Sequence, residues 1–229
     1  MIIRKAKERG QSSLGWLDSY HTFSFADYYD PRWRGFRSLR VINDDLVMPG
    51  KGFGTHPHQD MEIVTYVLSG LLEHKDSMDN GRVIRAGEVQ YMSAGSGVRH
   101  SEWNPSEDEA THFLQIWIEP EERGLDPEYA DWRPADSEAA KLLLVSRDGR
   151  AGSLKIRQDA DVYRIRLAPG QAVTHELKAG RGAWVQIATG EARLNGAALA
   201  TGDGASTEQP GELLLKAAHR TEAILFDLK

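Results

Sequence analysis

The stretch of sequence that decides the fold is residues 50–70, which read GKGFGTHPHQDMEIVTYVLSG. A glycine-rich turn leads into a histidine-bearing run, and an apolar, β-branched run then ends at Gly70. Runs of this length, bounded by Gly, Asn and Asp, are typical of short strands joined by tight turns. Comparable runs lie on both sides, as FRSLRVINDD, GEVQYMSAG and THFLQIWIE. The sequence from about residue 36 to residue 118 therefore predicts an all-β fold.

The same pattern occurs a second time along the chain. After a polar, proline-containing stretch at residues 119–138, strand-like runs resume with KLLLVS, VYRIRLA, AWVQIATG and AILFDL. The order of features repeats, since TYVLSG matches WVQIATG and THFLQIWIE matches TEAILFDL. We expect two small β-barrels in one chain, because closed sheets leave no exposed edges. The expected limits are residues 1–118 and 141–229 for the barrels, with a linker at 119–140.

Composition and charge limit the partners and the chemistry. The chain has 229 residues and a formal net charge of -6, which argues against broad binding to nucleic acid, because phosphate backbones recruit clustered Lys and Arg. No cysteine is present, so a metal would be held by imidazole and carboxylate groups. The start of the chain shows no signal-peptide pattern, and no run reaches the about eighteen apolar residues of a membrane span. We expect a cytoplasmic protein that binds neither nucleic acid nor membrane.

Two pairs of polar residues carry the expected chemistry. In THPHQDME, His56 and His58 are two residues apart, and strand side chains at that spacing point to the same face. In RHSEWN, His100 and Glu102 repeat the spacing. Two such pairs facing one barrel interior would supply three imidazoles and one carboxylate, which suit a divalent first-row metal with open positions. A structural zinc site is less favoured, because it would be closed by four tetrahedral ligands, often with sulfur.

The identity of the metal stays open at this point. We expect one divalent transition metal, with Fe(II) first and Mn, Ni, Cu or Zn as alternatives, since all accept imidazole and carboxylate ligands. The other histidines have no partner at ligand spacing and are expected to be structural: His21, His74, His112, His175 and His219.

These residues resemble a known family. The stretch GKGFGTHPHQDMEIVTYVLSG is similar to the first cupin motif and GEVQYMSAGSGVRHSEWN to the second, and cupins are double-stranded β-helix barrels. More narrowly, HTFSFADYYDP at residues 21–31, together with HPHQDMEIVTYVLSG and GSGVRHSE, resembles the pirin family of bicupins. The resemblance covers the N-terminal half, whereas the C-terminal half matches in layout only. It implies two cupin barrels in one chain.

The resemblance also bears on the ligands. General cupins bind metal through the glutamate of the first motif, here Glu62, but seven residues separate Glu62 from Gly70 and four separate Gly95 from His100, as in pirins. The resemblance to pirins implies that the fourth ligand is the glutamate two residues after the second-motif histidine, here Glu102. We therefore expect a structural role for Glu62. In the second half His175 stands alone, so that barrel is expected to hold no metal.

The resemblance implies an activity as well. Pirins include proteins with quercetin 2,3-dioxygenase activity, which implies metal-dependent opening of a flavonol ring with release of carbon monoxide. The expected partners are a small aromatic substrate and dioxygen. The 3-hydroxyl oxygen of the flavonol would bind at the metal, and Glu102 would accept its proton. The pocket is expected to be lined by apolar and aromatic residues near the motifs: Phe53, Met61, Met92 and Trp103.

Two other functions are open. Eukaryotic pirins are similar to transcription cofactors whose surface depends on the oxidation state of the metal, so this chain could be a redox-sensing regulatory protein without turnover. A basic patch for that role would come from Arg32, Arg34, Arg37 and Arg40, although such arginines are more often solvated or paired. A cupin isomerase, or a dioxygenase for another small aromatic or enolic compound, would differ only in what fills the pocket. A monomer is expected, because a bicupin already contains the two barrels that other cupins obtain by dimerising.

Overall fold

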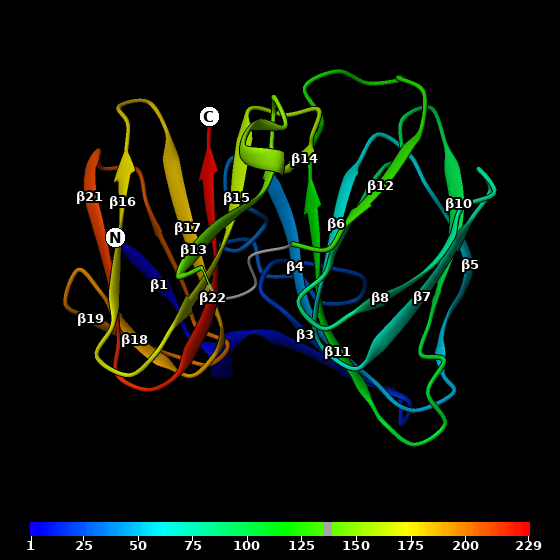
Figure 1. The fold of residues 1–229 in the computed structure, drawn as a ribbon, viewed down its shortest axis with the longest axis horizontal. Coiled ribbons are helices and arrows are strands. Elements are labelled where there is room, and N and C mark those ends of the chain that lie inside the picture. The colour runs from blue at the N-terminus through cyan, green and yellow to red at the C-terminus, as the bar shows by residue number, and fades with distance from the viewer. Residues whose placement is uncertain (135–138) are drawn as a thin grey trace. The chain divides into compact units, whose positions relative to one another are not determined.

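The computed structural model describes residues 1–134 and 139–229, and the chain divides into two β units. The first unit, called the N-terminal barrel below, comprises Gly10–Ala135 and Ile156–Gln158. The second unit, the C-terminal barrel, comprises Met1–Arg9, Asp136–Lys155 and Asp159–Lys229. Both units are built from mainly antiparallel strands joined by short turns (Figure 1), so the all-β fold with two cupin barrels is confirmed.

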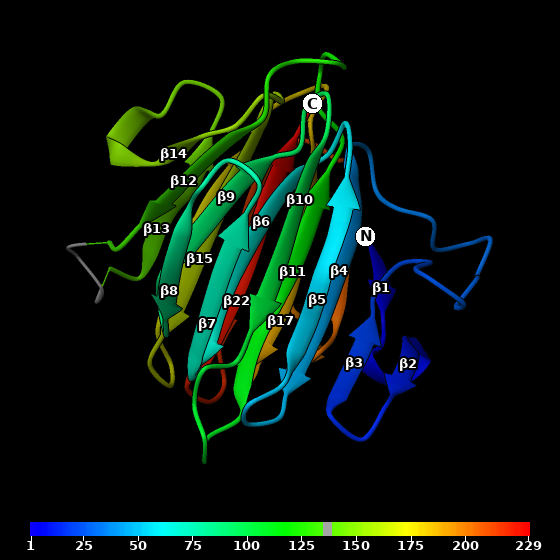
Figure 2. The same cartoon turned by 90° about the vertical axis from the view of Figure 1, so that its right-hand side faces the viewer.

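The N-terminal barrel has two sheets. The seven-stranded sheet has the order β12 (Glu128–Trp132), β9 (Val89–Ser93), β6 (Glu62–Ser69), β11 (Thr111–Ile118), β4 (Leu39–Val47), β3 (Leu17–His21), β2 (Gly10–Ser13). The four-stranded sheet has the order β5 (Gly52–His58), β10 (Val98–Trp103), β7 (Leu71–Asp76), β8 (Gly81–Arg85). Figure 2 shows the four-stranded sheet as one layer, with β10 between β5 and β7.

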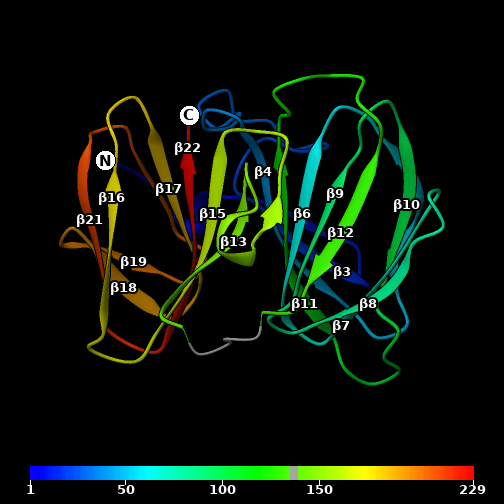
Figure 3. The ribbon, with the colours of Figure 1, turned by 45° about the horizontal axis from the view of Figure 1, so that its top comes forward.

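The C-terminal barrel repeats this plan. Its seven-stranded sheet has the order β1 (Ile2–Arg4), β20 (Gly204–Thr207), β17 (Gly182–Thr189), β22 (Thr221–Leu228), β15 (Ala160–Leu167), β13 (Lys141–Ser146), β14 (Leu154–Lys155). Its four-stranded sheet has the order β16 (Ala172–Leu177), β21 (Gly211–Ala217), β18 (Glu191–Leu194), β19 (Ala197–Ala200), as Figure 3 shows. Two single 3₁₀ turns complete the described secondary structure of this unit: η1 (Ala6–Glu8) and η2 (Arg150–Gly152).

The limits of the two units differ from the expected ones. β1 pairs with β20, so the first residues of the chain belong to the C-terminal barrel. β12 lies inside the expected linker at 119–140 and pairs with β9, so much of that stretch belongs to the N-terminal barrel. Residues 135–138 of the expected linker lie outside the described residues. A polar, proline-containing sequence predicts a break between strands, but it does not show that a later segment returns to a sheet edge.

The expected repeat is seen strand by strand. β9, β6, β11 and β4 are neighbours in one sheet, and β20, β17, β22 and β15 are neighbours in the other. Gly70 and Gly190 form the equivalent β6–β7 and β17–β18 turns, with φ of 79° and 85°. A Cβ atom at Gly70 would lie 2.7 Å from the Ala110 carbonyl oxygen, and one at Gly190 would lie 2.1 Å from that of Arg220. Glycine is therefore required at both turns.

The two interiors are filled differently. The C-terminal barrel buries a large apolar cluster that includes Leu215 and Leu225. The N-terminal barrel buries smaller apolar clusters and, in addition, polar side chains such as Glu102 and Gln115. Buried polar groups indicate a site rather than a plain core. Within the described residues, the structure contains no helix with the length and hydropathy needed to cross a membrane. The cytoplasmic location stays a prediction.

Candidate metal centre

Three histidines come together on the four-stranded sheet of the N-terminal barrel. His56 on β5 lies directly opposite His100 on β10, and His58 follows on the same face of β5. The ring centroids of His56 and His100 are 4.5 Å apart, and each lies 4.8 Å from that of His58. Ligand nitrogens of the three rings lie within 4.8 Å of one another. The structure thus brings together the three imidazoles that were singled out in the sequence.

Glu102, the expected fourth ligand, follows His100 across a bulge in β10 and is 2% exposed. Gln115 on β11 donates a hydrogen bond from Nε2 to the Glu102 Oε2 at 2.6 Å. Thr65 on β6 shares its hydroxyl hydrogen between Gln115 Oε1 at 2.8 Å and Glu102 Oε1 at 3.3 Å. Burial, with the charge of Asp45, raises the pKa of Glu102 to about 7, although these two hydrogen bonds act in the opposite direction. The opposite sheet therefore orients this carboxyl group.

Glu102 belongs to a second cluster that overlaps the first. A carboxylate oxygen of Glu102 and ring nitrogens of His74 and His100 lie within 4.8 Å of one another. Glu102 also lines the same cavity as His56 and His58. His100 is common to both clusters, so the four expected ligands form one connected group rather than four equidistant donors. His74, expected to be only structural, is an addition to this group.

Hydrogen bonds decide which ring nitrogen of His56 is free. Its Nδ1 lies 2.8 Å from the Gly54 carbonyl oxygen. A carbonyl oxygen only accepts, so Nδ1 carries the proton and Nε2 keeps its lone pair. This is the tautomer in which His56 can ligate a metal through Nε2.

A chain of hydrogen bonds fixes His100 in the same way. Gln90 donates from Nε2 to His74 Nδ1 at 3.3 Å, so His74 carries its proton on Nε2 and donates it to Asp76 Oδ2 at 3.0 Å. His100 Nδ1 lies 3.4 Å from the same His74 Nδ1, whose single lone pair it shares with Gln90, so His100 carries its proton on Nδ1. The lone pair of His100 is then on Nε2. The relay Asp76–His74–His100 leaves the ligand nitrogen free.

The residues present fit a divalent transition metal. His100 Nε2 is buried and has no hydrogen-bond partner in the described part of the chain. Burial and the neighbouring imidazoles lower the pKa of His58 to about 4 and that of His100 to about 2, so both rings are neutral and able to ligate. A cation would also offset the cost of burying the Glu102 carboxylate. Three nitrogens and one oxygen without sulfur favour a first-row metal over a closed structural zinc site.

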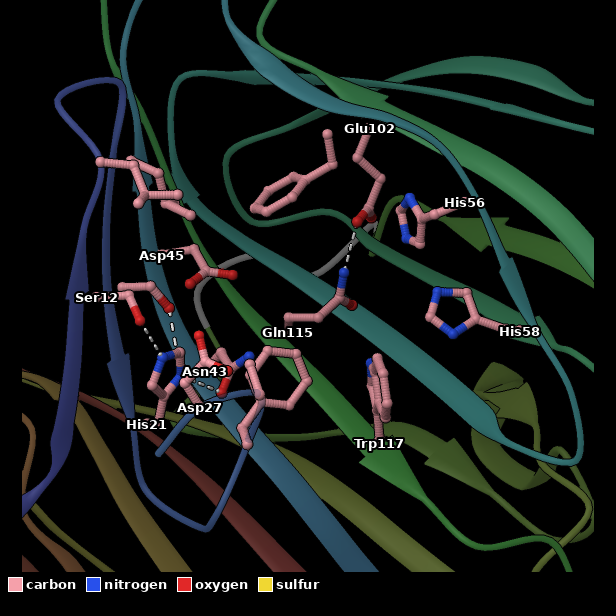
Figure 4. A pocket seen from close by; sticks show the side chains of 16 residues that line it. Ser12, His21, Asp27, Asn43, Asp45, His56, His58, Glu102, Gln115 and Trp117 are labelled. Carbon is pink, nitrogen blue, oxygen red and sulfur yellow. Dashed lines mark hydrogen bonds between the residues drawn. The ribbon is translucent and has the colours of Figure 1, made fainter. Parts of the chain in front are cut away.

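A cavity of about 270 Å³ lies beside these groups (Figure 4). Trp117 forms part of its wall and packs edge-on against His58, with 4.9 Å between ring centroids. The other apolar side chains of the wall are Leu14, Leu17, Phe25, Ala26 and Phe53. The polar wall is formed by Ser12, Ser19, His21, Asp27, Asn43 and Asp45. The cavity thus pairs apolar walls with a few polar groups, as small-molecule sites do.

Of the four residues expected to line a substrate pocket, Phe53 lines this cavity. Trp103 does not line it and is 41% exposed, because it directly follows Glu102 on β10 and points to the opposite face. Met92 is fully buried in an apolar cluster, and Met61 packs against that cluster. Proximity to the motifs in sequence did not distinguish the cavity wall from the core.

The polar wall of the cavity was not found from the sequence. His21 is nearly fully buried, with Nε2 at 3.0 Å from Ser12 Oγ and Nδ1 at 2.9 Å from Asn43 Oδ1. Asp45 lies two residues after Asn43 on the same face of β4 and is 4% exposed. The available signal was the run LRVINDDLV, which places Asn and Asp at alternate positions where a buried strand normally carries apolar side chains.

Glu62 has the structural environment that was expected for it. It is fully buried and accepts hydrogen bonds from the Tyr91 hydroxyl, from Ser93 Oγ at 2.7 Å and from the backbone N–H of Arg157 at 3.0 Å. Its carboxylate is thus satisfied by the protein, with no need for a cation.

His175 of the C-terminal barrel is held in a different way. Its Nε2 lies 2.8 Å from Asp227 Oδ2 and its Nδ1 lies 2.9 Å from Lys141 Nζ. Across the β16–β21 pair it faces Leu213. Both ring nitrogens are engaged, so neither is left for a metal. In the described ranges of this barrel, three-residue groups with metal-ligand geometry are not found.

Comparison with known proteins adds to this geometry. The sequence pattern of the family described as Pirin matches residues 2–118, and that described as "Quercetinase C-terminal cupin domain" matches residues 143–228. A quercetin 2,3-dioxygenase of Escherichia coli K12 is 50% identical over 228 residues, which cover 100% of this chain and 98% of that protein. A pirin-like protein of Caulobacter vibrioides is 40% identical over 232 residues, 99% of each chain. A crystal structure of a bacterial pirin from Escherichia coli in complex with nickel(II) has 50% identity and a TM-score of 0.95, covering 99% of this chain and 98% of that one.

Proposed function

Because the chain belongs to the pirin family, we propose that it is a metal-dependent dioxygenase that cleaves flavonols such as quercetin with release of carbon monoxide. The observation that carries the proposal is the group of His56, His58, His100 and Glu102 beside a cavity of about 270 Å³. Relatives named quercetin 2,3-dioxygenase support the reaction class, and the nickel(II) complex of a similar pirin supports a divalent metal.

The proposed ligands are His56, His58, His100 and Glu102, with Fe(II) as the first candidate for the metal. When bound, the metal would supply a Lewis acid that lowers the pKa of a coordinated hydroxyl and orients it towards dioxygen. The chain supports these ligands through Gln115 and Thr65 on Glu102 and through the relay behind His100. Such supporting hydrogen bonds hold ligands in the orientation and tautomer that binding requires.

The cavity supports a small, flat, apolar substrate. Its volume lies just below the roughly 300–1,000 Å³ that is typical of sites for drug-sized ligands, so a compact ring system would fill it. Phe25, Phe53 and Trp117 provide aromatic surfaces for such rings. Carboxylates of the polar wall, those of Asp27 and Asp45, supply hydrogen-bond acceptors for ring hydroxyls. A polyhydroxylated aromatic compound matches both kinds of wall.

The test is reconstitution of the metal-free protein with single divalent metals under anaerobic conditions, followed by measurement of oxygen uptake and carbon monoxide release with quercetin. We expect metal-dependent carbon monoxide release by the wild type, loss of it in Glu102→Ala, and no change in Glu73→Ala, whose side chain pairs with Lys75 outside the cavity. Metal content is measured for each protein. A metal-loaded wild type that is inert towards flavonols would contradict the proposal and favour the regulatory function or another substrate.

A further inference from the structure

The carboxylate of Asp45 is buried although the fold does not satisfy both of its oxygens. Asp45 lies on β4, opposite Ser19 on β3 and opposite Phe113 on β11. The residue is 4% exposed, and its Oδ1 is buried without a hydrogen-bond partner among the described residues. Buried carboxylate oxygens in folded proteins nearly always have a partner. An unsatisfied oxygen of this kind points to a group that is absent from the protein itself.

The position of Asp45 indicates what that group is. Asp45 lines the same cavity as His56, His58 and Glu102. Figure 4 shows it between His21 on one side and the hydrogen-bonded pair of Gln115 and Glu102 on the other. A molecule bound in the cavity would therefore meet Asp45 on the wall that does not carry the histidine ligands.

We propose that Asp45 is an acid–base residue of this site, and that its carboxylate accepts the proton of a hydroxyl group on the aromatic substrate. The inference rests on the proposed function. In this step the O–H bond of the substrate breaks and an O–H bond forms on the Asp45 carboxylate, while the negative charge passes from the carboxylate to the substrate oxygen. The step needs no oxidant or reductant.

Asp45 is better placed for this step than Glu102. The Glu102 carboxylate accepts hydrogen bonds at both oxygens, from Gln115 at 2.6 Å and from Thr65 at 3.3 Å, and it is also the proposed metal ligand. Asp45, by contrast, has one oxygen that accepts no hydrogen bond from the described part of the chain. A carboxylate whose lone pairs are already used by donors and by a cation is a weaker base than one with a free oxygen.

The charged surroundings of Asp45 agree with this role. Burial raises the pKa of Asp45 to about 7, with a hydrogen bond from Ser19 and the charge of His112 acting to lower it and the charge of Asp44 acting to raise it. The other ionisable groups that face it across the cavity are His21, Asp27, His56, His58 and Glu102. A proton acceptor works best when its pKa is close to the working pH.

The test compares the wild type with Asp45→Asn, which keeps the shape of the side chain but removes its basicity. The matched control is Asp18→Asn, because Asp18 lies on the neighbouring strand β3, does not line the cavity and bonds to Ser13 near the surface. Each protein is loaded with Zn(II), which does not change oxidation state, and mixed with quercetin without oxygen. The absorption of the bound flavonol then reports the pH at which it loses its proton. Turnover is measured separately with the active metal.

We expect unchanged metal content in all proteins, ionisation of bound quercetin near pH 7 in the wild type and in Asp18→Asn, and ionisation only at higher pH in Asp45→Asn. Turnover of Asp45→Asn at pH 7 should fall at least about 100-fold. If Asp45→Asn keeps both the ionisation pH and the rate while Glu102→Gln loses them, Glu102 is the proton acceptor and the inference is wrong, although the proposed function stands. A wild type that neither binds nor consumes any flavonol would overturn the proposed function and, with it, this inference.

A stability measurement separates this role from a structural one. Because burial raises the pKa of Asp45 in the folded state, folding favours the protonated form, and the contribution of Asp45 to stability is largest below its unfolded pKa and is lost as the pH rises through about 7. Asp45→Asn should therefore melt no lower than the wild type at pH 8 and should show a smaller loss of Tm between pH 5 and pH 8. A large drop in Tm at pH 8 would contradict the inference and show that Asp45 serves the fold.

Discussion

The two barrels have the same strand order but different interiors. In the N-terminal barrel, three neighbouring inward positions on β6, β9 and β11 are polar: Thr65, Gln90 and Gln115. In the C-terminal barrel, the matching positions on β17, β20 and β22 are apolar: Val185, Ala205 and Leu225. The register is the same in both, since Thr65 pairs with both glutamines and Val185 pairs with both apolar residues.

This difference shows what a metal site requires of a cupin barrel. The strand arrangement itself accepts either polar or apolar side chains in its interior, because equivalent strands have the same neighbours in both barrels. In the N-terminal barrel the polar trio holds the Glu102 carboxylate, and His56 faces His100. In the C-terminal barrel His175 faces Leu213, and its ring is bound by Asp227 and Lys141. The proposed ligands and the groups that orient them therefore occur together in the N-terminal barrel, and the described part of the C-terminal barrel has no such set.

The largest expected effect comes from removing a ligand. His100→Ala removes the imidazole that the two clusters share, so we expect loss of stoichiometric metal binding. His175→Ala, the matched change in the C-terminal barrel, should leave the metal content unchanged, because both ring nitrogens of His175 are engaged by the protein. Metal content after dialysis, measured by atomic emission, decides between these outcomes. Equal loss of metal in the two variants would show that the two barrels do not differ in metal binding.

The second largest effect is expected when an interior side chain of one barrel is replaced by the residue type at the matching position of the other. Gln115→Leu places the C-terminal residue type in the N-terminal barrel and removes the 2.6 Å hydrogen bond to Glu102. Loss of such a supporting bond typically weakens metal affinity by about 10- to 100-fold. Competition with a chromophoric chelator measures the affinity. An unchanged affinity would mean that Gln115 does not orient the ligand.

The reverse exchange is Leu225→Gln, which puts an amide into an apolar cluster. A buried amide without partners costs roughly 1–3 kcal/mol of folding free energy. We expect the variant to be less stable by that amount in urea and to keep the metal affinity of the wild type. A gain of metal in the C-terminal barrel would contradict the interpretation, because this barrel also lacks the facing histidine.

A smaller effect is expected at the relay behind His100. Asp76→Asn keeps the size of the side chain but weakens the acceptor that holds the His74 Nε2–H. We expect about a tenfold loss of metal affinity, near the lower limit for groups that orient a ligand. The melting temperature of the metal-free protein should also fall at pH 7, because Asp76 accepts hydrogen bonds from the backbone N–H groups of Met78 and Asn80 and its pKa is lowered. Isothermal titration with Zn(II) gives the affinity. An affinity equal to that of the wild type would show that the tautomer of His100 does not depend on Asp76.

Much of the fold, and the placing of the proposed ligands near one another, could be predicted from the sequence because both depend on local rules. Strand alternation places His56 and His58 on one face, and turn glycines such as Gly70 separate the strands. The repeat was visible because equivalent strands keep their order. The limits of the two units were harder, since β1 and β12 join sheets through pairings far apart in the sequence.

The remaining parts of the site depend on contacts between distant strands. His74 meets His100 only because β7 pairs with β10, and Asp45 enters the cavity from the other sheet. Met92 and Phe53 are equally apolar and equally near a motif, but one lies in the core and the other in the cavity wall. Sequence spacing does not contain this information, since it describes one strand at a time.

The smallest expected effect concerns the acid sensitivity of the C-terminal barrel. Burial alone would raise the pKa of Asp227, but hydrogen bonds from His175 and Arg181 lower it overall. A lowered pKa in the folded state stabilises the protein above the unfolded pKa near 3.8, and this stabilisation is lost as the pH falls further. In the N-terminal barrel, the residue at the matching position of β11 is Trp117, which carries no charge.

We therefore expect Asp227→Asn to lower the melting temperature of the metal-free protein at pH 7 by roughly 2–4 °C, corresponding to about 1 kcal/mol. The difference from the wild type should shrink as the pH falls below the unfolded pKa near 3.8, since the folded protein then loses this stabilisation. Glu191→Gln is the control, because the Glu191 side chain is 58% exposed and its Oε2 lies 3.8 Å from His219 Nε2. A deficit in Tm that is the same at pH 7 and at pH 3 would show that shape, and not the charge shared by Asp227 with His175 and Arg181, stabilises this barrel.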